Sequence, residues 1–190
     1  MLESKTQQKL KHFLEVWYNM QVIDVKNLDY KAVNEALRKA DKDCSIEGCC
    51  GQRFIAAGMS GKNLTINGIP GNALGAYLDN SNITVHANAQ DAVGDTMNEG
   101  KILIHGNVGD AAGYAMRGGK MFLRGNCKDI RFPEQVTARC ASDEDLAEIK
   151  EYLSEYCTDF GYSVDELLSA PFTIITPDSK NPYKQMYVAN

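Results

Sequence analysis

Acidic and amide side chains recur at a fixed spacing in the middle of the chain. Asp91, Asp110 and Asp129 stand 19 residues apart, and Gln52 and Asn72 precede them in the same column. On neighbouring coils of a solenoid, such carboxylates would lie about 4.8 Å apart and repel each other by roughly 0.9 kcal/mol in water. A cation or backbone N–H donors could offset this repulsion. We expect donors, because Asp or Asn at a turn commonly accepts the N–H two residues on, and uncharged amides share the column.

Two histidines form a second column. His86 and His105 are also 19 residues apart, with Asn67 before them and Arg124 after them. An arginine beside a site disfavours a bound cation, and no Glu or Cys falls in register to complete a tetrahedral ligand set. His12 is the remaining histidine, so no Ser–His–Asp or Cys–His arrangement is supported. We therefore expect this column to face solvent or an interface, and we predict no catalytic, cofactor-binding or metal-binding residue.

The six cysteines lack the spacings of metal or redox motifs. No C-x-x-C pair is present, and the two adjacent thiols, Cys49 and Cys50, sit between Gly48 and Gly51. We interpret all six as reduced thiols of an intracellular protein, small enough to be partly buried. A vicinal disulfide or a cluster at Cys49 and Cys50 is the alternative. The cysteines are Cys44, Cys49, Cys50, Cys127, Cys140 and Cys157.

These columns belong to a repeat that runs from Cys44 to Arg131. Its clearest copies are LTINGIPGNALGAYLDNSN, ITVHANAQDAVGDTMNEGK and ILIHGNVGDAAGYAMRGGK, with a period of 19 residues, and the first copy carries one extra residue. A fixed period with an embedded strand is typical of a solenoid. We predict a short parallel β-helix of about five coils. Its inward columns are Leu64, Ile83, Ile102 and Met121, and Ile46, Ile66, Val85, Ile104 and Leu123.

Other columns of the repeat predict its corners and its covered face. Glycines such as Gly48, Gly68 and Gly109 recur where the backbone needs positive φ or passes close to its neighbour. Because the same glycine pattern recurs in every coil, it indicates a structural role. The pattern matches neither a dinucleotide-binding loop nor a phosphate-binding loop. Leu103 and Phe122 interrupt the polar, outward-facing positions of the strands. We expect another segment or chain to cover them.

The flanking segments predict helical caps, which divides the chain into 1–43, 44–132 and 133–190. The first cap combines an apolar stripe at Leu10, Phe13, Leu14 and Trp17, a short strand near residues 22–25, and a helix capped by Asp29 that ends near Ala40. In the second cap we expect one helix over 142–160 with Ser142 as N-cap, a shorter helix after Ser163, and an extended tail that could cross onto a partner.

Composition excludes several functional classes. The formal net charge is −5 and no dense basic run is present, which argues against nucleic acid as a partner. No stretch approaches the roughly 20 apolar residues of a membrane span, and the first residues lack the apolar core of a signal peptide. We therefore expect a cytoplasmic protein.

The coils from Gly71 to Asn126, with the string Gly-Gln-Arg-Phe-Ile at 51–55, resemble the glycine-repeat (GXGXG) domain that closes the large chain of glutamate synthase. The resemblance covers residues 22–131 and implies a right-handed β-helix in a stand-alone form, without catalytic residues. It implies two partners: a glutaminase-type subunit that releases ammonia, and a synthase-type subunit that combines ammonia with 2-oxoglutarate. FMN and an iron–sulfur cluster are then expected on the partner subunits, and no cofactor in this chain.

The resemblance makes the chain a structural subunit of a glutamate-synthase-like complex, with no expected activity alone. A second interpretation is a structural subunit similar to the third chain of formylmethanofuran dehydrogenase, and a homo-oligomer is also open. A β-helix acyltransferase is disfavoured, because it would need an apolar residue at every sixth position. Stepping six residues from Ile83 reaches Ala89 and then Asp95, so this six-residue repeat is missing.

Overall fold

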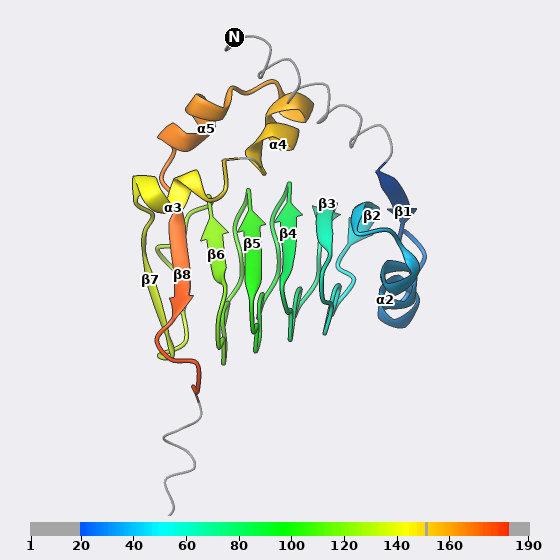
Figure 1. Cartoon of the computed structure of the whole chain (residues 1–190), viewed down its shortest axis with the longest axis horizontal. Helices are drawn as coiled ribbons and strands as arrows, with labels where there is room; N and C mark the ends of the chain where they lie inside the picture. Colours follow the sequence, from blue (N-terminus) through cyan, green and yellow to red (C-terminus); the bar gives the residue numbers. More distant parts are fainter. Residues whose placement is uncertain (1–19, 151, 183–190) are drawn as a thin grey trace, which may run out of the picture.

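One eight-stranded sheet runs the length of the molecule (Figure 1). The structure is a computed structural model that describes residues 20–150 and 152–182. Strands β1 to β6 pair in parallel in chain order, and β8 then β7 add antiparallel at the far end. The strands are β1 Gln21–Asp24, β2 Asp43–Cys50, β3 Asn63–Ile69, β4 Ser81–Val85, β5 Gly100–Ile104, β6 Lys120–Leu123, β7 Val136–Cys140 and β8 Thr173–Pro177.

The pairing register confirms the predicted solenoid of about five turns. Leu64 pairs with Ile83, Ile83 with Ile102, and Ile102 with Met121, so each step along the sheet is one repeat. Both predicted inward columns are buried in one continuous apolar core. Each coil therefore covers the apolar side chains of its neighbour, which is how a solenoid builds a core from short units.

The extra residue of the first copy forms a β-bulge. Ile46 pairs with Ile66, but Cys49 pairs with Gly68. Strand β2 therefore has one residue more than β3 between these two pairs. Gly48 lies in the bulge with φ of +72°, a conformation that glycine adopts without steric cost. The bulge restores the common register without moving the inward columns.

Left-handed backbone recurs at three alternating positions in each coil, with φ between +53° and +78°. Glycine occupies only some of these positions, and a non-glycine residue in this region costs about 1 kcal/mol. The sequence prediction located other corners, such as Gly48 and Gly68 with their positive φ, but it missed these three columns. The three columns are Phe54, Ala73, Ala92 and Ala111; Ala56, Gly75, Gly94 and Gly113; and Gly58, Tyr77, Thr96 and Ala115.

The N-terminal end of the sheet follows the prediction. β1 forms the short strand, and α2 (Tyr30–Lys39) begins where Asp29 accepts the N–H groups of Lys31 and Ala32. Val33 and Leu37 of α2 are buried in the core, so the helix packs on the first coils. The predicted apolar stripe at residues 10–17 lies outside the described residues.

The C-terminal residues close the other end with strands as well as helices. Residues 173–177 of the segment expected as an extended tail form β8, which pairs with β6 and β7 of its own chain, so the prediction is wrong for these residues. Its part at residues 183–190 lies outside the described residues. The single helix expected over 142–160 is also wrong, because it is divided into α3 (Asp143–Ala147) and α4 (Leu153–Phe160). α5 (Val164–Ser169) follows after Gly161, which ends α4 in a left-handed C-cap conformation.

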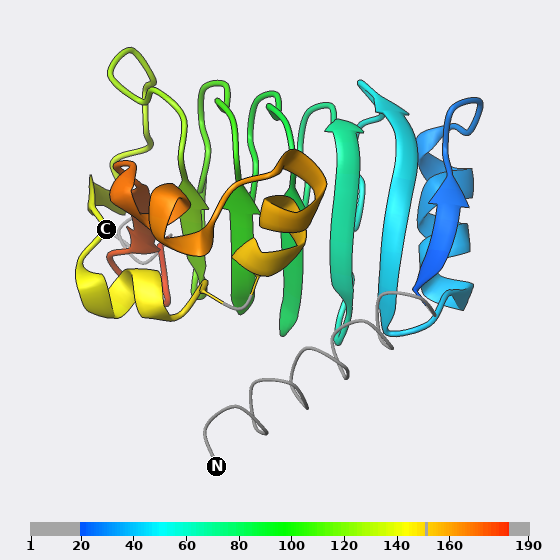
Figure 2. The ribbon, with the colours of Figure 1, turned by 90° about the horizontal axis from the view of Figure 1, so that it is seen from above.

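Helices α4 and α5 lie against the outward face of the sheet, over its middle and C-terminal strands (Figure 2). They bury Leu103 and Phe122 in a second apolar cluster, with Ile149, Leu153 and Leu167. The expectation that another segment covers these outward apolar residues is confirmed. None of the described helices combines the length and the apolar character that a bilayer crossing requires.

Candidate functional site

The aspartate column forms a ladder of hydrogen bonds between coils. Asp91 Oδ1 accepts the N–H of Asp110 at 3.0 Å, and Asp110 Oδ1 accepts the N–H of Arg131 at 3.1 Å. The expectation of backbone donors is confirmed, but the donors belong to the next coil and not to the residue two positions on. Gly109 stands beside this ladder because a Cβ there would lie 1.8 Å from Asp91 Oδ1.

A parallel asparagine ladder supports the same corner. Asn88 Oδ1 accepts the N–H of Asn107, and Asn107 Oδ1 accepts the N–H of Asn126, both at 2.8 Å. The sequence interpretation missed this ladder, although its 19-residue spacing could have revealed it. Each amide satisfies a backbone donor of the next coil, so both columns are occupied by structural hydrogen bonds. Among the residues that the structure describes, no three His, Cys, Asp or Glu side chains gather closely enough to hold a metal ion.

The two histidines lie beneath α4. Their side chains are buried, with exposed fractions of 8% for His86 and 5% for His105. The Tyr156 ring of α4 stacks on His105 with centroids 3.8 Å apart and an angle of 2°, and it meets His86 edge-on at 5.3 Å. Phe160 of α4 also packs against His86. The solvent-facing alternative is therefore wrong, and the column lies at an interface within the chain.

Arg124 fastens this aromatic cluster to the sheet. Its Nε donates to the carbonyl of His105 at 3.2 Å, its Nη2 donates to the Tyr156 hydroxyl at 2.8 Å, and its guanidinium lies 5.0 Å from the Tyr156 ring. A guanidinium can combine hydrogen bonding with a contact to an aromatic face. Arg124 follows the two histidines in the same column, and it thus belongs to the same cluster of side chains.

Burial keeps both imidazoles neutral. It lowers the pKa of His86 to about 4. It also lowers the pKa of His105 to about 3, with smaller contributions from His86 and Arg124. Neither ring nitrogen of His105 has a hydrogen-bond partner among the described residues. An imidazole with so low a pKa is a weak proton acceptor near neutral pH, and helix α4 covers both rings. The pair therefore acts as packing.

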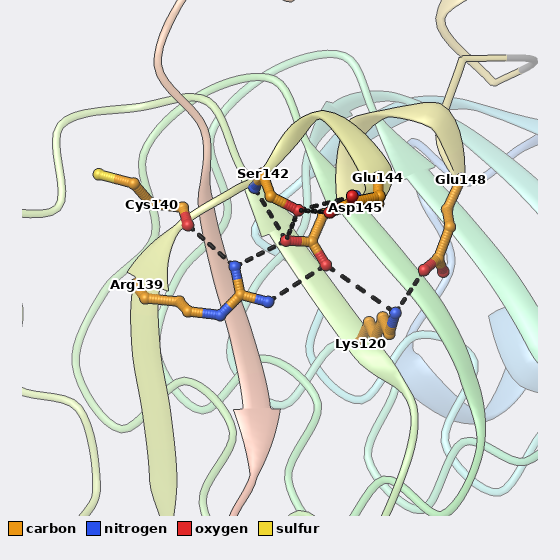
Figure 3. A network of polar contacts seen from close by, with 7 residues as sticks. All are labelled: Lys120, Arg139, Cys140, Ser142, Glu144, Asp145 and Glu148. Carbon is orange, nitrogen blue, oxygen red and sulfur yellow. Dashed lines mark hydrogen bonds and ion pairs between the residues drawn. The ribbon is translucent and has the colours of Figure 1, made fainter.

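A polar network fastens α3 to the sheet (Figure 3). Asp145 of α3 accepts hydrogen bonds from Nη1 and Nη2 of Arg139 at 2.6 and 3.2 Å, and from the N–H of Ser142 at 2.9 Å. Lys120 of β6 lies 4.0 Å from Asp145 and pairs with Glu148. The Ser142 and Asp145 capping box is the one that the sequence predicts. These donors hold the pKa of Asp145 well below its usual range.

Asp145→Asn is expected to lower the free energy of unfolding by about 1–2 kcal/mol near pH 7, because it removes the charge of a buried acceptor that pairs with the exposed Arg139. The wild-type contribution is present above the unfolded carboxyl pKa and is lost as pH falls through the lower folded value. Urea unfolding measures the change. Asp143→Asn, at an exposed position two residues earlier in the same helix, is the control. Equal losses in both variants would contradict the role assigned to Asp145.

A cleft of about 760 Å³ lies beside this network. It opens between the loop after β6, the strand β7 and the start of β8. Among the described residues, its charged lining residues are Arg124, Lys128 and Arg139, without a carboxylate. Two cysteines also line it, the half-buried Cys127 and the exposed Cys140. The repeat columns did not predict this cleft, because its walls come from segments that are distant in sequence.

The adjacent cysteines point in different directions. Cys49 is buried in the core, whereas its neighbour Cys50 is exposed, as the alternation of strand β2 requires, and both thiols are free. Burial and the neighbouring Cys50 raise the pKa of Cys49 to about 11. Since the thiolate is the reactive and metal-binding form, Cys49 is inert near neutral pH.

Comparison with known protein families agrees with this geometry. A family model described as the GXGXG motif matches residues 28–133, which include β2 to β6 and both hydrogen-bonded ladders. A search of the curated proteins finds no match.

Proposed function

Because this chain belongs to the GXGXG motif family, whose domain is found in the C-terminal region of the glutamate synthase large chain, we propose that it is a structural subunit of a glutamate-synthase-like complex. In this role it places the catalytic subunits relative to one another and carries out no chemical step itself. The complex would be cytoplasmic.

The observation that carries the proposal is the use of the repeated polar side chains. Asp91, Asp110, Asn88 and Asn107 each accept a backbone N–H of the following coil. Buried or corner donors must be satisfied, and these side chains satisfy them. The polar residues that recur most regularly in the repeat thus stabilise the fold through these hydrogen bonds. A rigid, ladder-bonded rod with covered faces suits a part that sets distances between other subunits.

The proposed partners follow from the family. One is a glutaminase-type subunit, which releases ammonia from glutamine, and the other is a synthase-type subunit, which binds FMN and an iron–sulfur cluster and uses the ammonia to aminate 2-oxoglutarate. In this proposal the chain holds neither cofactor.

Affinity purification of the tagged chain from its native host, at its native level, tests the proposal. We expect a glutaminase and a flavoprotein to co-purify, and we expect the eluate to form glutamate from glutamine and 2-oxoglutarate. The matched control is the same tagged chain carrying Ile104→Asp, which disrupts the core. Recovery of a formylmethanofuran dehydrogenase, or of neither enzyme, would overturn the proposal.

A further inference from the structure

Strand β7 forms an unpaired edge of the sheet. It is last in the strand order and has β8 as its one neighbour among the described strands. Four of its five residues, Thr137 to Cys140, are exposed. An exposed edge offers backbone N–H and C=O groups to which another extended segment can bind.

The hydrogen bonds that flank β7 fix which groups are free. The N–H of Ala141 donates to the carbonyl of Phe172 at 2.9 Å, and the N–H of Asp178 donates to the carbonyl of Gln135 at 3.0 Å. These bonds bracket the antiparallel ladder between β7 and β8. Bonding and non-bonding pairs alternate along such a ladder, so odd-numbered residues of β7 bond to β8.

Even-numbered residues of β7 therefore direct their backbone groups to the open edge. Thr137 and Arg139 bond to β8, whereas Ala138 and Cys140 face away from it. The carbonyl of Cys140 accepts a hydrogen bond from Arg139 Nη1 at 3.0 Å. With no described strand on this side of β7, the N–H and C=O of Ala138 and the N–H of Cys140 can pair with an added strand. Both residues also line the cleft.

The charge of the cleft indicates which kind of segment could add to the β7 edge. Of the described residues, Arg124, Lys128 and Arg139 line it without a carboxylate, although the chain as a whole has a net charge of −5. Arg139 already pairs with Asp145, but Lys128 is exposed and has no ion pair among the described residues. Apolar contacts are available as well, from Phe132 and other lining residues.

We propose that β7 and the basic cleft beside it bind an extended acidic segment of a partner protein, which adds to the sheet as a further strand. Its backbone pairs with Ala138 and Cys140, and its acidic side chains lie near Lys128 and Arg139. Side chains alternate along a strand, so the segment would carry apolar residues between its acidic ones. This inference does not depend on which complex the chain joins, because the edge and the charges belong to the chain alone.

The probe is a synthetic peptide, acetyl-Val-Glu-Val-Glu-Val-Glu-amide, titrated into the full chain and followed by calorimetry. We expect a Kd between about 1 μM and 1 mM, and binding at least tenfold weaker for the same peptide with Lys in place of Glu. A peptide with Pro in place of the central Val should also bind weakly, since proline cannot donate to the ladder.

Two variants of the chain locate the binding. Ala138→Pro removes an N–H that faces the open edge and should abolish binding, while the ladder to β8 stays intact. If Ala138→Pro does not fold, Lys128→Gln still tests the site, with an expected loss of about tenfold. Lys150→Gln is the control, because it removes the same charge from an exposed position that does not line the cleft.

Three results would overturn the inference. The first is equal binding of the acidic and basic peptides, or binding of neither. The second is competition by tripolyphosphate with no effect of Ala138→Pro, which would make the cleft an anion site without strand pairing. The third is self-association of the chain that Ala138→Pro abolishes, which would make a second copy the occupant of this edge. Peptide binding without co-purified enzymes would leave this inference standing and reject only the proposed function.

Discussion

Ile104→Asp is expected to lower the free energy of unfolding by at least about 4 kcal/mol, a large part of the roughly 5–15 kcal/mol by which native domains are stable. Ile104 is fully buried in the inward column of β5 and pairs with Val85 and Leu123 on the neighbouring strands. A carboxylate there has no cation within the apolar core. The loss combines the missing apolar contacts, the cavity and the cost of burying a charge.

The matched control is Ile69→Asp. Ile69 ends strand β3 and is 42% exposed, so the same substitution should cost about 1 kcal/mol or less. Urea unfolding followed by circular dichroism measures both changes. If Ile104→Asp does not yield soluble protein, Ile104→Ala should still show a loss of about 2–4 kcal/mol. Equal shifts for the two aspartate variants would reject the inward assignment of the column.

Lowering the pH from about 6.5 to about 5 is expected to remove roughly 3 kcal/mol of stability, about 1.6 kcal/mol for each buried histidine. The folded pKa values of His86 and His105 are lowered to about 4 and about 3. The unfolded chain binds protons at a pKa of about 6.5, so it holds more protons than the folded chain throughout this window. Stability must then fall as pH falls, and the loss continues until pH reaches the folded values.

His105→Phe isolates this effect. Phenylalanine can keep the stacking on Tyr156 and cannot be protonated. The substitution also removes no hydrogen bond, because neither ring nitrogen of His105 has a partner among the described residues. We expect stability near pH 7 to change by about 1 kcal/mol or less and the pH dependence to fall to about half. Urea titrations at several pH values give the slope. An unchanged slope in His105→Phe would show that His105 is already protonated or exposed in the folded chain.

Sequence predicted the solenoid well because its information is local and repeated. Ile83 and Ile102 occupy equivalent positions of consecutive repeats, and parallel pairing brings such positions together directly. The bulge at Gly48 was also visible as one extra residue in the first copy. Capping residues such as Asp29 and Ser142 act within one helical turn, so their type and spacing predict the helix starts.

Contacts outside the repeat could not be predicted from spacing along the sequence. The strand Thr173–Pro177 joins β6, although Met121 and its partner Ile175 are far apart in sequence and no period links them. Sequence indicated that Leu103 and Phe122 are covered but not by which segment. The basic cleft was missed for the same reason, because Lys128 and Arg139 come together through the placement of β7 and β8.

The constant step between paired strands has a consequence for how the chain folds. From β3 to β6 every pairing joins residues that are 19 positions apart, so each coil closes a loop of the same modest length. β8 must instead return to β6 across the whole of β7 and the three C-terminal helices. Since longer loops cost more entropy to close, the coils can assemble one after another from any starting point, and the C-terminal strands should dock last. A nascent chain would therefore present an open β6 edge until Thr173–Pro177 has emerged.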